Sequence, residues 1–258
     1  MSKFINELKL VSQASPQPMG FKAAPVVPPK PKMLLIATLA EAGIEHLADY
    51  VTGANAGLVP IPKLSSGAKT VNKVSQAMPD IPWGGWLKDT GGEKVKPVVE
   101  AGGDFLVFPS DTPLAILQDT EVGKILEVGA SLSEGLLRTI DDLPVDAVLI
   151  GGEQEKDYLL TWRHLMLFQR CGDLLTKPLL ASVPSDVSAS ELQALWAAGV
   201  VGVVVEAPPE GRISELRQMI DKLTFPLPIK RRKAEPLLPR ITEETKTAPE
   251  EETEEEEE

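Results

Sequence analysis

The sequence predicts one α/β domain: a closed (β/α)8 barrel of eight parallel strands, each followed by a helix, with a capping helix before it and a disordered acidic tail after it. Three observations predict this fold: eight short apolar runs, a register shared by several of them, and helix-start signals behind them. Near-continuous apolar strands are typical of parallel sheets covered by helices, and eight such units close a barrel. An open doubly wound sheet is the alternative, but no glycine-rich dinucleotide turn follows the first run and the units keep one register.

The eight apolar runs divide residues 33–225, a length at the compact end for such a barrel. In chain order they read MLLIATL from Met33, DYVTG from Asp49, IPWGGWL from Ile81, DFLVFP from Asp104, KILEVGA from Lys124, VDAVLIGG from Val145, PLLASVP from Pro178 and VVGVVVE from Val200. Four of the runs align so that one column holds Asp49, Asp104, Asp146 and Val201. This weak internal repetition supports a series of similar strand-then-helix units.

Helix-start signals of the form S/T-x-x-E follow several of the runs. The pairs are Thr38 with Glu41, Thr90 with Glu93, Ser131 with Glu134, and Ser188 with Glu191. In this box the hydroxyl and the carboxylate bind free backbone N–H groups at the first turn of a helix. Thr112 before Pro113 marks a fifth helix start, with proline at the first helical position.

The first 32 residues differ in composition from the barrel. Three apolar side chains there fall at helical spacing, namely Phe4, Leu8 and Val11. We therefore expect a short amphipathic helix, and a proline-rich arm follows it. Glu7 and Lys9 interrupt the apolar pattern, which argues against a signal peptide.

Residues 226–258 form a tail that is first basic and then acidic. Lys230–Lys233 is a run of four basic residues, and from Thr242 onward ten glutamates and one lysine give a net charge of −9, which leaves −3 of the total −12 for the rest of the chain. A glutamate run repels itself and buries nothing, so we expect a disordered solubilising tail, with docking to a basic partner as the alternative. The basic run has no interleaved aromatic residues and lies beside the glutamates, so nucleic-acid or anionic-lipid binding is not expected.

The overall composition, 43% apolar and 25% charged, is that of a globular domain. The densest apolar run, Ala197–Val205, has nine residues, well short of the roughly 20 that a membrane helix needs. Cys171 is the single cysteine, which excludes an internal disulfide and a multi-thiolate metal site. We therefore expect a cytoplasmic protein that does not enter a membrane.

The segments EAGGDFLVF and AAGVVGVVV resemble the helix–strand junctions of aldolase-type TIM barrels, including the phosphate-binding group. The resemblance covers residues 33–225. It implies the TIM-barrel fold and identifies no subfamily, because one barrel hosts many chemistries.

In such barrels the active site lies at the carboxyl ends of the strands. Four residues there are the candidate catalytic residues: Lys88, Asp111, Glu127 and Glu206. By resemblance to aldolases, Lys88 could form a Schiff base if burial kept its amine neutral, whereas a solvated lysine held charged by Asp89 is the other interpretation. Asp111 and Glu127 end neighbouring strands and could share acid and base roles or hold a divalent cation, unless a one-residue register shift turns Glu127 outward.

Four further residues are the candidate ligand-binding residues: Trp86, Ser110, Gly151 and Gly152. Phosphate-binding barrels hold the anion on backbone N–H groups after strands seven and eight, where glycine lets the ligand approach. Here these strands exit through Pro184, Pro208 and Pro209, which have no N–H, and Glu206 would repel a phosphate. We therefore expect no phosphate in the customary place, which leaves the glycine pair after strand six as a position for a ligand.

Other motifs point away from catalysis. Neither His46 nor His164 falls at a strand end, so a Ser-His-Asp triad and a His-rich metal site are not expected. The SSGAKT motif lacks the glycine-lysine step of a P-loop. The stretch from Gly53 to Asn72 is the longest connection, and we expect it to act as a lid in which Lys63 or Lys69 could meet an anion.

Two functions are compatible with these residues. The first is a barrel that binds a small polar metabolite or a protein partner without the usual chemistry of the fold. The second is an enzyme of the lyase or isomerase type that uses Lys88 and the strand-end carboxylates. No cofactor, oligomeric state or substrate is indicated by the sequence.

Overall fold

The computed structural model describes residues 2–12, 31–39, 47–62, 64–88, 95–117, 121–129, 131–151, 159–206 and 208–224. By its internal contacts the chain divides into two units, residues 1–225 and 226–258. Several features of the sequence analysis lie outside the described residues: the proline-rich arm, Glu41, His46, Lys63, Asp89, Thr90, Glu93, Gly152 and the tail.

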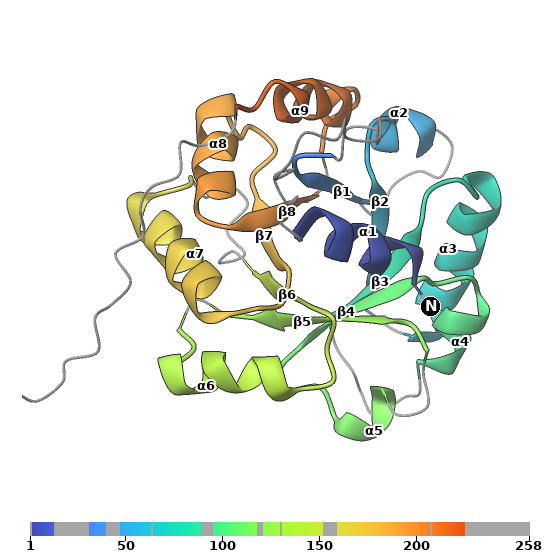
Figure 1. Ribbon diagram of the computed structural model, residues 1–258. Helices are drawn as coiled ribbons and strands as arrows, with labels where there is room; N and C mark the ends of the chain where they lie inside the picture. The colour runs from blue at the N-terminus through green and yellow to red at the C-terminus, as the bar shows by residue number, and fades with distance from the viewer. Residues whose placement is uncertain are drawn as a thin grey trace, which may run out of the picture. The chain divides into compact units, whose positions relative to one another are not determined.

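Eight parallel strands close into a barrel in the order β1 to β8, as Figure 1 shows. The strands are β1 (Leu34–Thr38), β2 (Ala56–Ile61), β3 (Trp83–Leu87), β4 (Phe105–Pro109), β5 (Gly123–Val128), β6 (Ala147–Ile150), β7 (Leu179–Val183) and β8 (Val200–Glu206). The last strand pairs with the first in parallel, which completes the ring. The predicted (β/α)8 barrel is confirmed, and the chain has the aldolase-type TIM-barrel fold.

The helices lie around the outside of the barrel, except for α1, which lies across one of its ends (Figure 1). The helices are α1 (Lys3–Ser12), α2 (Leu47–Val51), α3 (Leu64–Ala77), α4 (Lys96–Glu100), α5 (Leu114–Leu117), α6 (Glu134–Thr139), η2 (Ile140–Asp142, a 3-10 turn), α7 (Trp162–Leu174), α8 (Ala189–Ala197) and α9 (Arg212–Asp221). Because every strand runs in the same direction, the starts of the outer helices surround the carboxyl ends of the strands.

The prediction of the second strand was wrong. The DYVTG run from Asp49 lies in and just after α2, where Leu47 and Val51 are buried one helical turn apart, and the true strand is AGLVPI. Pro60 obscured this strand in the sequence. Pro60 lies two residues after Leu58, so the backbone nitrogen of Pro60 faces the same neighbouring strand, β1. The Leu58 carbonyl already accepts the N–H of Leu39, which lies beyond the end of β1. The N–H that Pro60 lacks would therefore have no partner in β1.

The stretch predicted to be a lid is therefore regular structure. It comprises β2 and most of α3, and the SSGAKT motif lies in the first turns of that helix. Gly67 of the motif packs against Ile61, because a Cβ at that position would lie 2.5 Å from the Ile61 side chain. The glycine serves the contact between helix and strand.

The predicted helix starts were partly right. The box of Ser188 and Glu191 is present at the start of α8, with the hydroxyl and the carboxylate both bonded to backbone N–H groups. The box assigned to Ser131 was wrong by two residues, because Ser133 is the N-cap of α6. A box that the sequence analysis missed begins α7, where the ring of His164 takes the place of the usual glutamate against Thr161.

The partner of Thr38 in its predicted capping box, Glu41, lies outside the described residues, so this box stays a prediction, and Thr112 was taken only to mark the helix start before Pro113. Both hydroxyl groups are buried and have no hydrogen-bond partner among the described residues. Helix α5 nevertheless begins directly after Pro113, in agreement with a proline-marked start.

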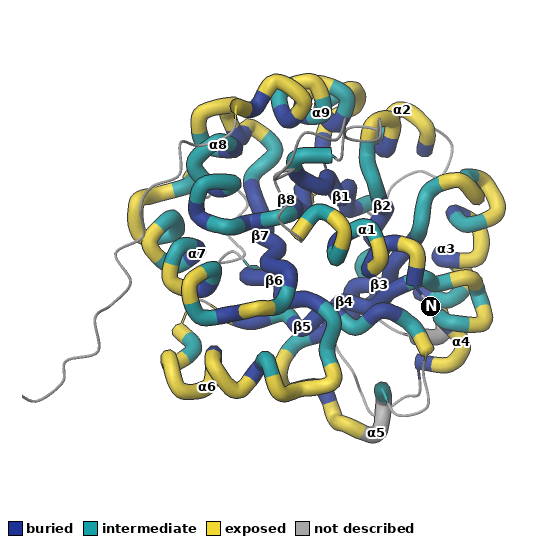
Figure 2. The backbone as a smooth tube through the Cα atoms, viewed as in Figure 1, coloured by how far each residue is buried: buried dark blue, intermediate teal, exposed yellow. Residues whose placement is uncertain are grey.

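Strand side chains alternate between an inner core on the barrel axis and an outer core beneath the helices. Along β1, Leu34 and Ile36 belong to the inner core, and Leu35 and Ala37 to the outer one. The inner core also contains Trp86, Phe105, Val107, Ile125, Leu149, Leu180 and Val204. Figure 2 shows the strands as a mostly buried ring inside helices whose outer sides are exposed.

Helix α1 closes the amino-terminal end of the barrel. Phe4, Ile5 and Leu8 are buried in the inner core, and the rings of Phe4 and Phe105 lie 4.5 Å apart between centroids. Gly123 at the start of β5 leaves space for this helix, because a Cβ there would lie 2.4 Å from the Ile5 side chain. The amphipathic helix predicted from the spacing of its apolar residues is confirmed.

A carboxylate anchors the first turn of α1. Asp104, just before β4, accepts hydrogen bonds from Ser2 Oγ at 2.8 Å and from the backbone N–H groups of Lys3 and Phe4 at 2.9 Å each. These donors would otherwise be free at a helix start, where a negative charge is also favourable. The column of aspartates seen in the sequence thus includes one that holds the capping helix.

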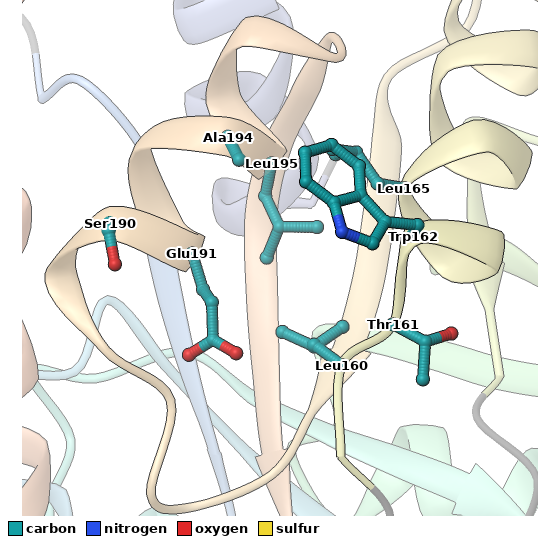
Figure 3. A pocket seen from close by; sticks show the side chains of 8 residues that line it. All are labelled: Leu160, Thr161, Trp162, Leu165, Ser190, Glu191, Ala194 and Leu195. Carbon is teal, nitrogen blue, oxygen red and sulfur yellow. The ribbon is translucent and has the colours of Figure 1, made fainter.

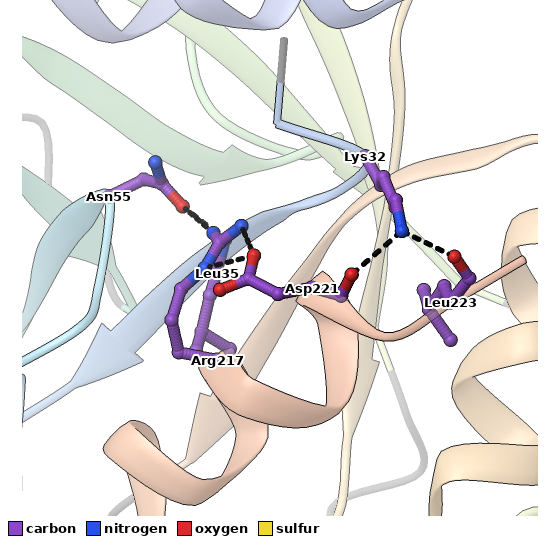
Figure 4. A network of polar contacts seen from close by, with 6 residues as sticks. All are labelled: Lys32, Leu35, Asn55, Arg217, Asp221 and Leu223. Carbon is purple, nitrogen blue, oxygen red and sulfur yellow. Dashed lines mark hydrogen bonds and ion pairs between the residues drawn. The ribbon is translucent and has the colours of Figure 1, made fainter. Parts of the chain in front are cut away.

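Further polar side chains tie together the starts of neighbouring strands at this end. Asp146 accepts from the backbone N–H of Lys124 and from Lys9 Nζ, each at 3.1 Å. On the other side of the barrel, Asn55 Oδ1 accepts from the Leu35 N–H at 3.0 Å and from Arg217 of α9 at 3.1 Å (Figure 4). The amino-terminal end is thus closed by an apolar plug with paired polar groups around it.

No helix in the described part of the chain has the length and apolar character needed to cross a membrane. Cys171 is buried on α7 as a free thiol, and this burial raises the pKa of the thiol. A buried thiol of this kind serves packing between α7 and the barrel.

Candidate functional site at the barrel mouth

The inward-facing residues at the carboxyl ends of the strands define the barrel mouth. Because strand side chains alternate, the next inward-facing position beyond the inner core can be counted for each strand. These positions are Thr38, Pro60, Lys88, Pro109, Glu127, Gly151, Ser182 and Glu206. This set contains three of the four candidate catalytic residues and excludes Asp111. The register error considered for Glu127 does not occur, since this carboxylate faces the barrel axis.

Trp86, Glu127 and Lys88 lie together on one side of the mouth. The indole Nε1–H of Trp86 donates a hydrogen bond of 2.7 Å to Glu127 Oε2, which joins β3 to β5 across β4. Trp86 is buried, and its donor group is one that needs a partner when buried. Glu127 is partly exposed, so the bond fixes a carboxylate that remains in contact with solvent.

Lys88 covers the face of the same tryptophan. Its Nζ lies 3.4 Å from the centre of the Trp86 ring, which is a cation–π contact. The side chain is otherwise exposed, as expected of the first residue after β3. The indole therefore holds a carboxylate by its edge and an ammonium group by its face.

Gly151 lies beside the carboxylate of Glu127. A Cβ at this position would lie 2.8 Å from Glu127 Oε1, closer than real Cβ atoms approach another atom. Glycine is thus required at the end of β6 for Glu127 to keep its inward position. Gly151, which was predicted to bind a ligand, lies beside the Glu127 carboxylate in this structure. Its contact with a ligand stays a prediction.

Thr38, Ser182 and Glu206 form a second group on the neighbouring strands β1, β7 and β8. Thr38 and Glu206 are Cα partners in the pairing of β1 with β8, and Ser182 is the partner of Val204, two residues before Glu206. Ser182 Oγ donates to Glu206 Oε1 over a long 3.4 Å. Both hydroxyl residues are buried, whereas Glu206 is exposed.

Asp111 and Ser110 do not join either group. They lie in the exposed turn after β4, and no hydrogen bond or ion pair links them to the mouth residues in the described part of the chain. The shared site considered for Asp111 and Glu127 stays a prediction. Within the described ranges, no three His, Cys, Asp or Glu side chains are placed to hold a metal ion.

The position after strands seven and eight is occupied by an arginine. Arg212, at the start of α9, donates to the backbone carbonyls of Ser185 at 2.6 Å and Val187 at 2.9 Å, and pairs with Glu215 at 2.8 Å. The guanidinium thus ties α9 to the connection after β7 instead of facing the mouth. Sequence reasoning missed this role, because an arginine at a helix start carries no signal that separates anchoring from anion binding.

His164 contributes to a helix start and not to the mouth. Its Nδ1 accepts the Thr161 backbone N–H at 3.1 Å. The expectation that this histidine lies on an outer helix is confirmed.

A second hollow lies outside the barrel, between the first turns of α7 and α8, with a volume of about 530 Å³. Figure 3 shows Leu160 and Leu195 projecting into it, with the Trp162 indole along one side. Trp162 is 81% exposed and Met166 is 72% exposed on the same helix. The hollow is mostly apolar and contains none of the predicted site residues.

Thr38 and Ser182 are the mouth residues that sequence reasoning left out of the candidate site. Thr38 was assigned to a capping box because Glu41 follows at the right spacing, although the same residue is the last inward position of β1. The inner register of each strand, counted from its apolar residues, is the signal that could have found both.

Comparison with known proteins finds similarity in fold alone. No family model matches the chain, and no curated protein matches it in sequence. The tryptophan synthase alpha subunit of the hyperthermophile Pyrococcus furiosus superposes with a TM-score of 0.57 at 13% identity, over 74% of this chain and 96% of that one. The tryptophan synthase of M. tuberculosis, in an open form with BRD0059 bound, gives a TM-score of 0.54 at 14% identity, over 73% of this chain and 91% of the other.

Proposed function

We propose that the barrel mouth binds a small polar metabolite that carries no phosphate group, with Glu127 as the principal anchor. One observation carries this proposal: the Trp86 indole holds Glu127 at 2.7 Å while Lys88 lies over the ring of the same tryptophan. An aromatic side chain with a few placed polar groups, at the carboxyl ends of barrel strands, is the usual composition of a ligand site in this fold.

Each of these residues has a distinct role in the proposal. The hydrogen bond to Oε2 of Glu127 fixes the orientation of the carboxylate and leaves Oε1 for a donor group of the ligand. Lys88 is exposed and held by the ring face alone, so its ammonium group can reach a negatively charged or carbonyl oxygen. The absence of a side chain on Gly151 preserves the space beside Oε1.

The ligand is proposed to lack phosphate because the residues after β7 and β8 offer few donors to an anion. Pro184, Pro208 and Pro209 have no N–H, and Arg212 is directed at backbone carbonyls. Glu206 adds a negative charge where a phosphate would need a positive field. The fold similarity to tryptophan synthase alpha subunits therefore brings no substrate with it.

An enzyme of the lyase or isomerase type is the second candidate, favoured by the orientation of Glu127. A carboxylate fixed at one oxygen and open at the other could take a proton from a bound substrate. Schiff-base chemistry on Lys88 is less well supported, because this side chain is exposed, whereas lysines that form Schiff bases are typically desolvated.

The test is a thermal-shift screen of the protein against small metabolites with and without phosphate groups, run in parallel on Glu127→Gln. A ligand of the mouth raises the melting temperature of the parent protein in proportion to its affinity. The proposal expects phosphate-free polar compounds among those that do so, and a loss of at least tenfold in their affinity in Glu127→Gln.

Asp186→Asn is the matched control, since it removes an exposed carboxylate in the connection after β7. Its ligand response should equal that of the parent protein. A ligand that binds Glu127→Gln as tightly as the parent, or a response confined to phosphate compounds, would overturn the proposal.

A further inference from the structure

The group formed by Thr38, Ser182 and Glu206 has a feature that its packing does not explain. Thr38 is 5% exposed, faces the barrel axis, and its Oγ1 has no hydrogen-bond partner among the described residues. A buried hydroxyl without a partner destabilises the folded state, and valine would fill the same space without this cost. A bound molecule could supply the hydrogen bond that this hydroxyl does not make with the described residues.

We propose that this group is a subsite for the primary ammonium group of a small aliphatic amine. The inference deepens the proposed function, on which it rests, by naming the chemical class of the ligand. Its basis is the juxtaposition of three oxygen-bearing side chains on the adjacent strands β7, β8 and β1. Thr38 and Glu206 are Cα partners on neighbouring strands, which lie about 4.8 Å apart, and Ser182 Oγ lies 3.4 Å from Glu206 Oε1, so a small group beside Glu206 is also close to these hydroxyls.

The chemistry of the subsite favours a cationic donor. An ammonium group has N–H donors and no acceptor, and the subsite offers it the hydroxyl oxygen Thr38 Oγ1 and a carboxylate oxygen of Glu206. The negative charge of Glu206 compensates the positive charge of the ligand. A ligand hydroxyl would supply a single donor and leave that charge without a counterion.

The surroundings of the subsite exclude an anion. Pro208 and Pro209 follow β8 within three residues of Glu206 and contribute no backbone N–H. Ser182 Oγ donates to Glu206 Oε1 over 3.4 Å, which places this hydroxyl beside the carboxylate. Lys88, the cationic side chain among the mouth positions, lies on the other side at β3, where it can meet a carboxylate of the same ligand.

The test uses linear ω-amino acids of three to six carbons and the matched ω-hydroxy acids, which differ only in the group offered to the subsite. Melting temperature is measured at increasing concentrations of each compound. At least one amino compound should raise the melting temperature of the parent protein, and its hydroxy counterpart should do so at least tenfold more weakly.

Three variants assign the effect to the subsite. Thr38→Val should melt at a higher temperature than the parent protein without ligand, because the unpaired hydroxyl is gone, and should lose at least tenfold in affinity for the amine. Thr38→Ser retains the hydroxyl and should keep most of the affinity. Glu206→Gln should lose the preference for the amino compound over the hydroxy compound.

Several results would overturn the inference. Equal binding of amino and hydroxy compounds, an unchanged affinity in Thr38→Val, or a lower melting temperature of unliganded Thr38→Val would each contradict it. If phosphate-free compounds bind in a way that depends on Glu127 while no amine binds, this inference fails and the proposed function stands. If no compound of either screen binds, both fail.

Discussion

The two ends of the barrel are built in opposite ways. At the amino-terminal end, α1 fills the barrel with Phe4 and Leu8, and the carboxylate of Asp104 accepts three hydrogen bonds from the first turn of that helix. At the carboxyl-terminal end, the hydroxyl of Thr38 is buried without a partner, and the carboxylate of Glu206 is exposed. The groups that anchor α1 are paired within the chain, although Ser75 Oγ of α3 is also buried without a partner among the described residues. The mouth differs in placing a buried hydroxyl and an exposed carboxylate side by side on the barrel axis.

This difference separates an end that contributes to stability from an end at which we propose that a ligand binds. A paired polar group lowers the free energy of the folded state, whereas an unpaired buried group raises it and persists only where another requirement keeps it. In barrels of this fold, stability is usually carried at the amino ends of the strands and ligand contact at the carboxyl ends, and we propose the same division here. The predictions below test this division, beginning with the largest effect.

Phe4→Ala should be the most damaging single change. It removes a fully buried ring from the inner core and its contact with Phe105, so we expect a loss of roughly 3–5 kcal/mol in the free energy of unfolding. Chemical denaturation followed by circular dichroism measures it. Leu10→Ala on the 52% exposed face of the same helix is the control and should change stability by less than about 0.5 kcal/mol.

A loss below about 1 kcal/mol in Phe4→Ala would mean that α1 rests on the barrel without closing it. The amino-terminal end would then not be the stabilising end, and the comparison between the ends would fail.

Asp104→Ala should have an intermediate effect. It leaves Ser2 Oγ and the N–H groups of Lys3 and Phe4 without their acceptor, at a cost of about 1–3 kcal/mol. Hydrogen exchange should show faster exchange confined to α1. The exposed Asp80→Ala is the control, and equal stability of the two variants would contradict an anchoring role for Asp104.

Glu7→Gln should have the smallest effect and one that depends on pH. Burial, and secondly the nearby Asp104, raise the pKa of Glu7 above its ordinary value of 4.5. The folded state therefore holds the proton more tightly than the unfolded state, and stability decreases as the pH rises from about 4.5 through the folded-state pKa. The glutamine side chain of the variant does not ionise, so the variant should melt at a higher temperature than the parent protein at pH 7.

The advantage of Glu7→Gln should disappear below about pH 4, where the parent carboxyl is protonated in both states. Thermal melts of both proteins across this pH range check the sign. The exposed Glu121→Gln should show no such crossover, and a constant offset at all pH values would exclude ionisation as the cause.

The fold could be predicted from the sequence because seven of the eight strands fall on the apolar runs that the sequence analysis identified. The exception, β2, contains Gly57 and Pro60, residues that in most strands would end the pairing. Pro60 is tolerated only because β1 ends before reaching it, a fact of tertiary pairing that no local pattern records. Local propensity therefore placed a strand at α2, where burial of Leu47 and Val51 reveals a helix.

The candidate site could be predicted in part. Strand ends and alternation brought out Trp86, Lys88, Glu127 and Gly151, which the structure places together. Asp111 was included because it follows a strand, and in the structure it lies in the exposed turn after β4. Whether any of these residues contacts a ligand stays a prediction.

Thr38 was left out of the candidate site, although it lies at the barrel mouth. Its spacing to Glu41 matched a capping box, and nothing in the sequence separates a capping threonine from one that faces the barrel axis. The pairing of Thr38 with Glu206 across β1 and β8 arises only when the barrel closes.

The most direct test of the account is the mapping of ligand contacts by nuclear magnetic resonance. A compound that raises the melting temperature is titrated into isotope-labelled protein, and backbone amide shifts are followed. The account predicts changes at the carboxyl ends of β1, β3, β5 and β8, around Thr38, Lys88, Glu127 and Glu206, with α1 unaffected. Changes centred on α1, or on the hollow between α7 and α8, would contradict it.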